Sequence, residues 1–168
     1  MQINIIAVGT KMPAWVNDCC SDYIKRMPSE YGLRLIEVAA EKRSKSQSLE
    51  ATRQRETARL LLAVPKGSFI VALDERGSAP TTKALAQKLQ QWQMDGRDIS
   101  LLIGGPDGID FSQPLSAKAG GNTGEKAWPD WRLSLSALTL PHPMVRVLLV
   151  EQLYRAWSLG AGHPYHRE

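Results

Sequence analysis

The sequence predicts a single α/β domain, residues 1–168, with a mostly parallel sheet flanked by helices. Short apolar runs alternate along the chain with longer stretches in which apolar residues recur at helical spacing. Two of the runs, Phe69–Leu73 and Ile99–Ile103, are almost entirely apolar, which is typical of parallel strands covered on both faces by helices. A length of 168 residues is enough for one domain with its own core.

The first two strands are expected at Gln2–Val8 and Leu33–Ala40. Gln2–Val8 is mostly apolar and ends at Gly9, and Leu33–Ala40 begins with alternating apolar and polar residues. A helix is expected between them, from Pro13 to about Pro28, because proline suits a first helical turn and apolar residues follow at helical spacing.

The charged stretch EKRSKSQ that follows the second strand is expected to be a flexible loop. Ser48 is a suitable N-cap for a second helix that reaches Val64. The third strand is the first of the two apolar runs named above and is expected to end at the polar stretch DERGSAP. Thr81 or Thr82 then caps a third helix that closes near Gly96, before the second apolar run forms the fourth strand.

Residues 109–132 interrupt this alternation of strands and helices. Their middle, Ser116–Glu125, is rich in serine, alanine, glycine and asparagine, which predicts a flexible insertion. After it, Leu133 and Leu135 alternate with serine, but the apolar phase slips at Ala137. A slipped phase indicates a strand that gives way to a loop or bulge.

The last helix, Pro143–Leu159, is unusually apolar. From Val145 to Val150 its only charged residue is Arg146, so we expect it to be buried all round, with a second subunit covering the face that one domain leaves open. Glu151 and Arg155 form a favourable pair one helical turn apart. Arg146 needs a partner, for which the candidates are Glu151, of the same or another chain, and an RNA phosphate.

Composition limits the class of protein. Apolar residues make up 43% of the chain and charged residues 23%, as in soluble globular proteins. No apolar run approaches the roughly 20 residues of a membrane span, and the first residues do not form a signal peptide, so we expect a cytoplasmic protein. Cys19 and Cys20 are adjacent, which indicates neither a disulfide framework nor a metal site.

The chain is modestly basic, with a net charge of +4 and a pI of about 9.2. The basic residues gather in three clusters, namely Lys42, Arg43 and Lys45, then Arg53, Arg55 and Arg59, and finally His163, His166 and Arg167. Such clusters suit a phosphate backbone, and an ordinary solvated surface is the alternative.

The fourth strand runs into a glycine-rich loop, Gly104–Gly108, in the stretch SLLIGGPDG. Glycines after a buried strand allow a ligand to approach the backbone closely, and a simple tight turn is the alternative. The loop matches neither the dinucleotide-binding nor the P-loop motif. The chain also lacks a nucleophile elbow, and its three histidines do not have metal-binding spacing, so neither a hydrolase triad nor a metal enzyme is indicated.

Four stretches resemble a known family. They are AVGTKMPAWV, DGRDISLLIGGPDG, LSLSALTLPHPMVRVLLVEQLYRAW and HPYHRE. In them the sequence resembles the ribosomal RNA large-subunit methyltransferase H family of SPOUT methyltransferases, and the resemblance extends over nearly the whole chain. It implies a SPOUT-type fold with a deep C-terminal trefoil knot, and a homodimer. It also implies that S-adenosyl-L-methionine donates a methyl group to N3 of pseudouridine 1915 in 23S rRNA, on the assembled ribosome.

Three loops at strand ends hold the cofactor in this family. By resemblance the cofactor-binding residues are Leu73, Gly104, Gly105, Leu135, Ser136, Ala137, Leu138, Thr139 and Leu140. The insertion 109–132 is longer than the resemblance leads us to expect and falls between two of these loops. We expect it to be a passive surface extension, and a cover over the pocket is the alternative.

The reaction must remove the N3 proton, and the sequence offers no obvious base. The catalytic candidates are Glu151, His142, Tyr154 and His166, with Arg155 positioning the base or the RNA. The RNA-binding candidates are Lys42, Arg43, Lys45, Tyr165 and Arg167. Two other functions stay open, namely a SPOUT enzyme that acts on transfer RNA and a ribosome-binding dimer without enzymatic activity.

Overall fold

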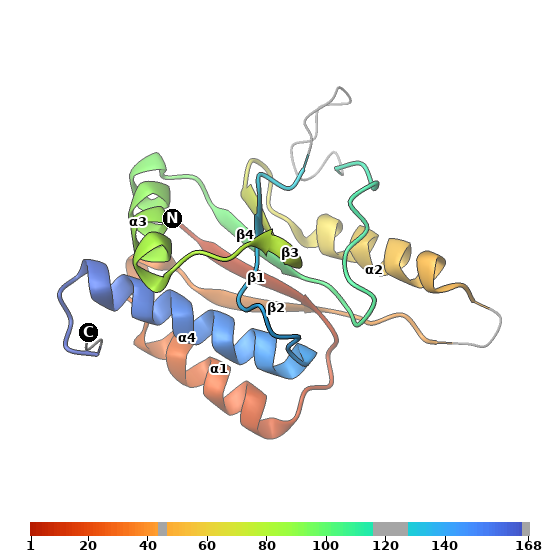
Figure 1. Ribbon diagram of the computed structural model, residues 1–168, viewed down its shortest axis with the longest axis horizontal. Coiled ribbons are helices and arrows are strands. Elements are labelled where there is room, and N and C mark those ends of the chain that lie inside the picture. Colours follow the sequence, from red (N-terminus) through yellow and green to blue (C-terminus); the bar gives the residue numbers. More distant parts are fainter. Residues whose placement is uncertain (44–46, 116–127, 166–168) are drawn as a thin grey trace.

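The computed structural model describes residues 1–43, 47–115 and 128–165 (Figure 1). The elements along the chain are β1 (Ile3–Val8), α1 (Ala14–Arg26), a 3-10 turn (Ser29–Tyr31), β2 (Arg34–Val38), α2 (Leu49–Ala63), β3 (Phe69–Ser78), α3 (Thr82–Asp95), β4 (Ile99–Ile103), β5 (Trp131–Leu133) and α4 (His142–Gly160). Of the described helices, none is long and apolar enough to cross a membrane.

The five strands form one sheet in the order β2-β1-β4-β3-β5, and every neighbouring pair is parallel. One face of the sheet packs against α1, α3 and α4 and the other against α2. Successive side chains of β1 enter opposite cores, so that Ile5 faces the three-helix layer and Ile6 faces α2. The predicted α/β class, with a parallel sheet flanked by helices, is therefore confirmed.

The helix starts follow the predicted capping chemistry. Ser48 Oγ accepts a hydrogen bond from the Ala51 N–H at 3.1 Å, and Thr81 Oγ1 accepts one from the Ala84 N–H at 3.2 Å. Thr81 is therefore the cap of α3, and Thr82 is its first helical residue. Gly96 ends the helix with a φ of 70°, a conformation that glycine adopts without strain.

The prediction that the third strand ends at Leu73 is wrong, because β3 continues to Ser78. Its pairing with β5 is irregular, since Leu73 and Ser78 both pair with Leu133. A Cβ on Gly77 would lie 2.7 Å from the Arg132 backbone, so a glycine is needed for this close approach. Polar residues after Leu73 suggested a loop, whereas they form the partly exposed end of a bulged strand.

The prediction that all of 109–132 is a flexible insertion is wrong at both ends. Ile109 and Asp110 are buried directly after the glycine loop, Trp128 is buried against the α2 side of the sheet, and Trp131–Leu133 is the edge strand β5. The alternation of leucine and serine predicted a strand that begins at Leu133, whereas β5 ends at this residue. The serine-rich middle of the segment lies outside the described residues.

Arg146 is fully buried on α4, and its partner is Glu37 of β2, which is neither of the candidates expected, Glu151 and an RNA phosphate. The Arg146 Nη1 lies 2.5 Å from Glu37 Oε1, and Nη2 donates to the carbonyl oxygens of Val8 and Gly9. No local pattern in the sequence distinguishes Glu37 as the partner of Arg146. The pair joins α4 to the carboxyl ends of β1 and β2.

Candidate active site

A cavity of about 630 Å³ opens where β4 and β5 end and α4 begins, beside the second half of β3. In open α/β sheets, ligands bind at the carboxyl ends of the strands, and a volume of several hundred Å³ suits a small organic molecule. The walls come from Leu73–Arg76, Ile103–Ser112, Arg132–Ser136, Leu138–Leu140, and the α4 residues His142 and Val145, with Arg53 of α2 on one side.

The structure brings the predicted cofactor-binding residues together. Three separate segments contribute to this cavity, namely the second half of β3, the glycine loop and the loop after β5. Eight of the nine residues line it, namely Leu73, Gly104, Gly105, Leu135, Ser136, Leu138, Thr139 and Leu140. Ala137 does not belong to the lining. The loop that contains it is folded on itself, because Ser136 Oγ accepts a hydrogen bond from the Leu138 N–H at 2.9 Å.

The glycine loop 104–108 is a tight turn that also lines the cavity. The Gly108 N–H donates to the Gly105 carbonyl at 2.9 Å. A Cβ on Gly104 would lie 2.9 Å from the Gly108 backbone and 2.8 Å from the Ile109 side chain. The turn alone therefore requires glycine at position 104, and the same turn presents its backbone to the cavity.

Several charged residues of the cavity were missed by the sequence reasoning. Arg132 lies over the Phe111 ring, and its guanidinium carbon is 3.9 Å from the ring centroid. Nη1 of Arg132 also lies 3.7 Å from Asp74 Oδ2. Arg53 also lines the cavity, and its buried Nε has no hydrogen-bond partner among the described residues. In the sequence Arg53 belongs to a basic cluster, and no motif distinguishes Arg132 or Phe111.

Asp110 follows the glycine loop as a well-bonded carboxylate in the cavity wall. Burial raises its pKa, but hydrogen bonds from Ser112 and Gln113 outweigh this effect and hold the pKa below its usual value. The Asp110 N–H donates to Thr57 Oγ1 of α2 at 2.9 Å. Asp110 is therefore fixed in its ionised form and ties the loop to α2.

His142, one of the catalytic candidates, lines the cavity at the start of α4. Burial and the nearby Arg146 guanidinium lower the pKa of His142, although hydrogen bonds with the backbone of Gly104 and Val8 oppose the shift. Nε2 of His142 accepts a hydrogen bond from Arg146 Nε at 3.3 Å, which places the imidazole proton on Nδ1. The lone pair that would take up a substrate proton is therefore already engaged.

The other described catalytic candidates gather elsewhere, on the second half of α4. Glu151 Oε1 accepts hydrogen bonds from Arg155 Nε at 2.8 Å and from the Tyr165 hydroxyl at 3.3 Å. The buried Tyr154 ring packs on Tyr165 at 4.7 Å between centroids. The expected Glu151–Arg155 pair is confirmed, but none of these four residues lines the cavity of the same chain.

The described part of the tail is docked onto the helices. The Tyr165 hydroxyl lies 2.8 Å from that of Tyr23 on α1, and Arg155 lies over the Tyr165 ring. Burial and the hydrogen bond with Tyr23 raise the Tyr165 pKa, so the phenol stays protonated. His166 and Arg167, as well as Lys45, lie outside the described residues.

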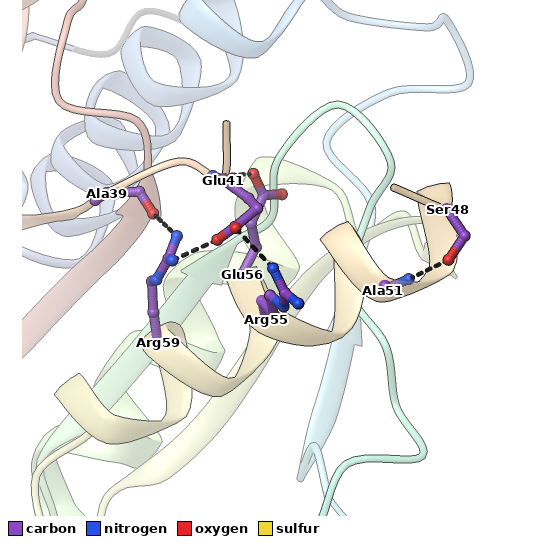
Figure 2. A network of polar contacts seen from close by, with 7 residues as sticks. All are labelled: Ala39, Glu41, Ser48, Ala51, Arg55, Glu56 and Arg59. Atoms are coloured by element: carbon purple, nitrogen blue, oxygen red, sulfur yellow. Dashed lines mark hydrogen bonds and ion pairs between the residues drawn. The ribbon is translucent and has the colours of Figure 1, made fainter. Parts of the chain in front are cut away.

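Of the predicted RNA-binding cluster, Lys42 and Arg43 lie in the described segment after β2. Arg43 Nη2 lies 2.7 Å from Asp107 Oδ2 in the glycine loop, so this arginine is paired next to the cavity. Two further basic residues, Arg55 and Arg59, bond to Glu41 and lower the pKa of its carboxyl group (Figure 2). In the described ranges no group of three or more His, Cys, Asp or Glu residues is arranged to hold a metal ion.

Comparison with known proteins identifies the family. The model of a family described as "Predicted SPOUT methyltransferase" matches residues 1–166. The chain belongs to the SPOUT methyltransferase family. Two curated proteins named "Ribosomal RNA large subunit methyltransferase H", from Methylibium petroleiphilum and Thioalkalivibrio sulfidiphilus, are each 48% identical to this SPOUT family member over 168 residues, and one of the same name from Acidovorax sp. is 49% identical.

Each of these matches covers 100% of both chains. The expectation that the segment 109–132 is longer than is usual for the family stays a prediction. The segment provides Phe111 and Asp110 to the cavity wall, so its first residues belong to the candidate active site.

Proposed function

We propose that this chain uses S-adenosyl-L-methionine to methylate N3 of pseudouridine 1915 in 23S rRNA, on assembled ribosomes in the cytoplasm. The observation that carries the proposal is the meeting of three chain-distant segments in one cavity, at eight of the nine positions that the family resemblance named. The relatives' names, which specify the large-subunit ribosomal RNA, support the substrate class.

The residues of the cavity fit the proposed cofactor. Leu73, Ile103 and Leu135 supply apolar walls for an adenine ring, and the glycine loop offers bare backbone for hydrogen bonds. The Nε of Arg53, which finds no partner in the part of the chain that the structure describes, is suited to the carboxylate of the methionine part. Asp74 and Asp110 give the same cavity negative charge, which suits a cationic sulfonium.

S-adenosyl-L-methionine, when bound, supplies an electrophilic methyl group on its sulfonium. In the transfer an N3–methyl bond forms as the sulfur–methyl bond breaks, and the N3 proton passes to a base. The protein must align N3 with the methyl group and provide that base. His142 shapes the cavity but has its acceptor nitrogen engaged by Arg146, so we assign it a positioning role.

We further propose that Glu151, Arg155 and Tyr165 serve the RNA side of the reaction in a partner subunit's cavity. Glu151 lies nine residues after His142 on α4, about 13 Å along the helix axis at a rise of 1.5 Å per residue. The cluster is thus too distant to share the cavity of its own chain. His166 and Arg167, which follow Tyr165, complete the proposed RNA-facing group, with Lys42, Arg43 and Lys45 from the other basic cluster.

A homodimer built on α4 accounts for the distribution of apolar residues on that helix. Leu149 and Leu153 are fully buried in the core of one chain, whereas Val147 and Leu148 are only half-buried. Leu138, in the loop before α4, is 76% exposed. A second copy of the chain that packs on this surface would cover these side chains. We also propose that the segment from Ser134 to α4 forms the trefoil knot that the resemblance implies.

The test is methyl transfer from labelled S-adenosyl-L-methionine to ribosomes that lack the modification, in parallel with free 23S rRNA and with transfer RNA. We expect label on ribosomes alone, and mass spectrometry should locate it at N3 of pseudouridine. Label on transfer RNA would instead favour the other SPOUT activity. Ribosome binding without label, and without heat on titration of the cofactor, would show a binding protein and contradict the proposal.

A further inference from the structure

Glu56 of α2 has a buried carboxylate that contacts the glycine loop on the side away from the cavity. Only 3% of the residue is exposed, and Oε2 has no hydrogen-bond partner among the described residues. A Cβ on Gly105 would lie 2.2 Å from this oxygen and 3.0 Å from the carboxyl carbon. Glu56 does not line the cavity, whereas Gly105 does. The carboxylate therefore lies against the outer side of the loop.

We propose that Glu56 is a positioning residue for the loop 104–108. Its carboxylate determines the position of the Gly105 backbone. This position in turn determines the affinity of the cavity for S-adenosyl-L-methionine. The inference rests on the proposed function for the identity of the ligand, and on the contacts of Glu56 for the positioning itself.

The carboxylate is held in place by the segment after β2 (Figure 2). Glu56 Oε1 accepts a hydrogen bond from the Glu41 N–H at 2.9 Å. The Glu41 side chain in turn bonds to Arg55 at 3.1 Å and to Arg59, and Arg59 also donates to the Ala39 carbonyl at 2.9 Å. These hydrogen bonds hold the Glu41 segment in place. The Glu56 side chain can therefore turn away from Gly105 only if its hydrogen bond with the Glu41 N–H breaks.

The other end of the loop is tied to the same segment. Asp107 bonds to Arg43, two residues after Glu41, at 2.7 Å. The loop therefore contacts this region at Gly105, next to the buried Glu56, and at the partly exposed Asp107, and the Asp110 N–H that follows it donates to Thr57 of α2. Because exposed ion pairs contribute little, the Arg43–Asp107 pair alone is a weak constraint on the loop.

The geometry separates two reasons for a glycine at position 105. If the ligand needs the space, any side chain blocks binding, whatever occupies position 56. If Glu56 needs the space, shortening Glu56 makes room for a side chain. Gly105 does not have a positive φ, so an alanine there adds no backbone strain of its own and the substitution reports on the clash.

The experiment compares Gly105→Ala, Glu56→Ala and the double variant by calorimetric titration with S-adenosyl-L-methionine. We expect Gly105→Ala to weaken binding at least about tenfold and the double variant to bind within about threefold of Glu56→Ala. Equal losses in Gly105→Ala and the double variant, with both folded, would overturn the proposal. Glu50→Ala, an exposed position on the same helix, is the matched control and should bind as the wild type does.

A steady-state readout separates positioning from a merely structural role. In Glu56→Ala we expect the KM for the cofactor to rise and kcat at saturating cofactor to stay within about threefold of the wild type. Glu56→Gln, which keeps the shape and an oxygen for the Glu41 N–H, should restore most of the affinity. An equal fall of kcat in all Glu56 variants, without a change in KM, would contradict positioning.

A ligand-free measurement makes the inference independent of the proposed function. The Gly108 N–H bonds to the Gly105 carbonyl, so its hydrogen exchange reports on the loop. Exchange of this amide should become at least about tenfold faster in Glu56→Ala, with the amides of β1 and β4 unchanged. Unchanged exchange would overturn the positioning role. Failure of the wild type to bind the cofactor would overturn the proposed function alone.

Discussion

The guanidinium of Arg146 on α4 lies 2.5 Å from the carboxylate of Glu37 on β2, although 109 residues separate them in the chain. Arg146 is fully buried, and a buried charge is tolerated only with such partners. The same guanidinium bonds to the carbonyls of Val8 and Gly9. The helix that borders the cavity is thereby fixed to the carboxyl ends of β1 and of the edge strand β2.

Glu37→Ala should destabilise the fold by about 3 kcal/mol, because it leaves the buried Arg146 without its counter-charge. Denaturant unfolding monitored by circular dichroism measures the loss. Glu30→Ala removes an exposed carboxylate and serves as the control. Equal stability of the two variants would show that the carbonyl oxygens alone satisfy Arg146.

The His142 imidazole should make stability fall in acid. Burial and Arg146 lower the pKa of His142 in the folded chain. Near pH 6.5, the ordinary pKa of histidine, the unfolded chain therefore binds a proton at this residue and the folded chain does not. The unfolding free energy should therefore decrease as the pH drops through 6.5, by at most about 1.4 kcal/mol per pH unit from this group. Below the lowered pKa the contribution should become constant.

Unfolding titrations of the wild type and of His142→Gln, at about pH 7.5 and about pH 5.5, measure this dependence. The variant keeps an acceptor for Arg146 and removes the titration, so its stability should change less between the two conditions. An identical change in both proteins would assign the acid sensitivity to other groups.

Much of the fold could be predicted from local patterns. Strand and helix order, the caps at Ser48 and Thr81, and the parallel sheet all follow from rules that act within a few residues. The extension of β3 to Ser78 could not be predicted in this way, because it depends on a backbone approach between Gly77 and a strand more than fifty residues away.

The candidate site was predicted unevenly for the same reason. The loops at Gly104 and Leu135 were found through family motifs, and the structure places them together. The contacts of Arg146 with Glu37 and of Glu56 with the glycine loop join distant segments through buried charge. A buried carboxylate on an amphipathic helix looks like any other charged residue in the sequence, so no local pattern distinguishes it.

Leu148→Glu should convert the proposed dimer to a monomer. Leu148 is half-buried on α4, beside side chains that the core of one chain does not fully cover, and a charge in the middle of a subunit interface is costly. Sedimentation velocity measures the change, with Leu62→Glu, at an exposed position on α2, as the control. A wild type that sediments as a folded monomer at micromolar concentration would contradict the dimer.

Arg43→Gln should weaken binding to ribosomes and reduce the salt dependence of the binding constant by about one unit of slope, as expected for one lost phosphate contact. In the free protein Arg43 bonds to Asp107, so Asp107→Asn should release the arginine and leave ribosome binding at least as strong. Filter binding over a salt series measures both variants. A loss of affinity with Asp107→Asn and none with Arg43→Gln would contradict an RNA contact at Arg43.

The most direct test of the account is methyl transfer by the purified protein to ribosomes that lack the modification, with the product nucleoside identified by mass spectrometry. We expect one methyl group per ribosome, on N3 of a pseudouridine in 23S rRNA, and a raised KM for the cofactor in Gly105→Ala, which distorts the loop that lines the cavity. Absence of methylation by the wild type at saturating S-adenosyl-L-methionine, or methylation of transfer RNA instead, would contradict it.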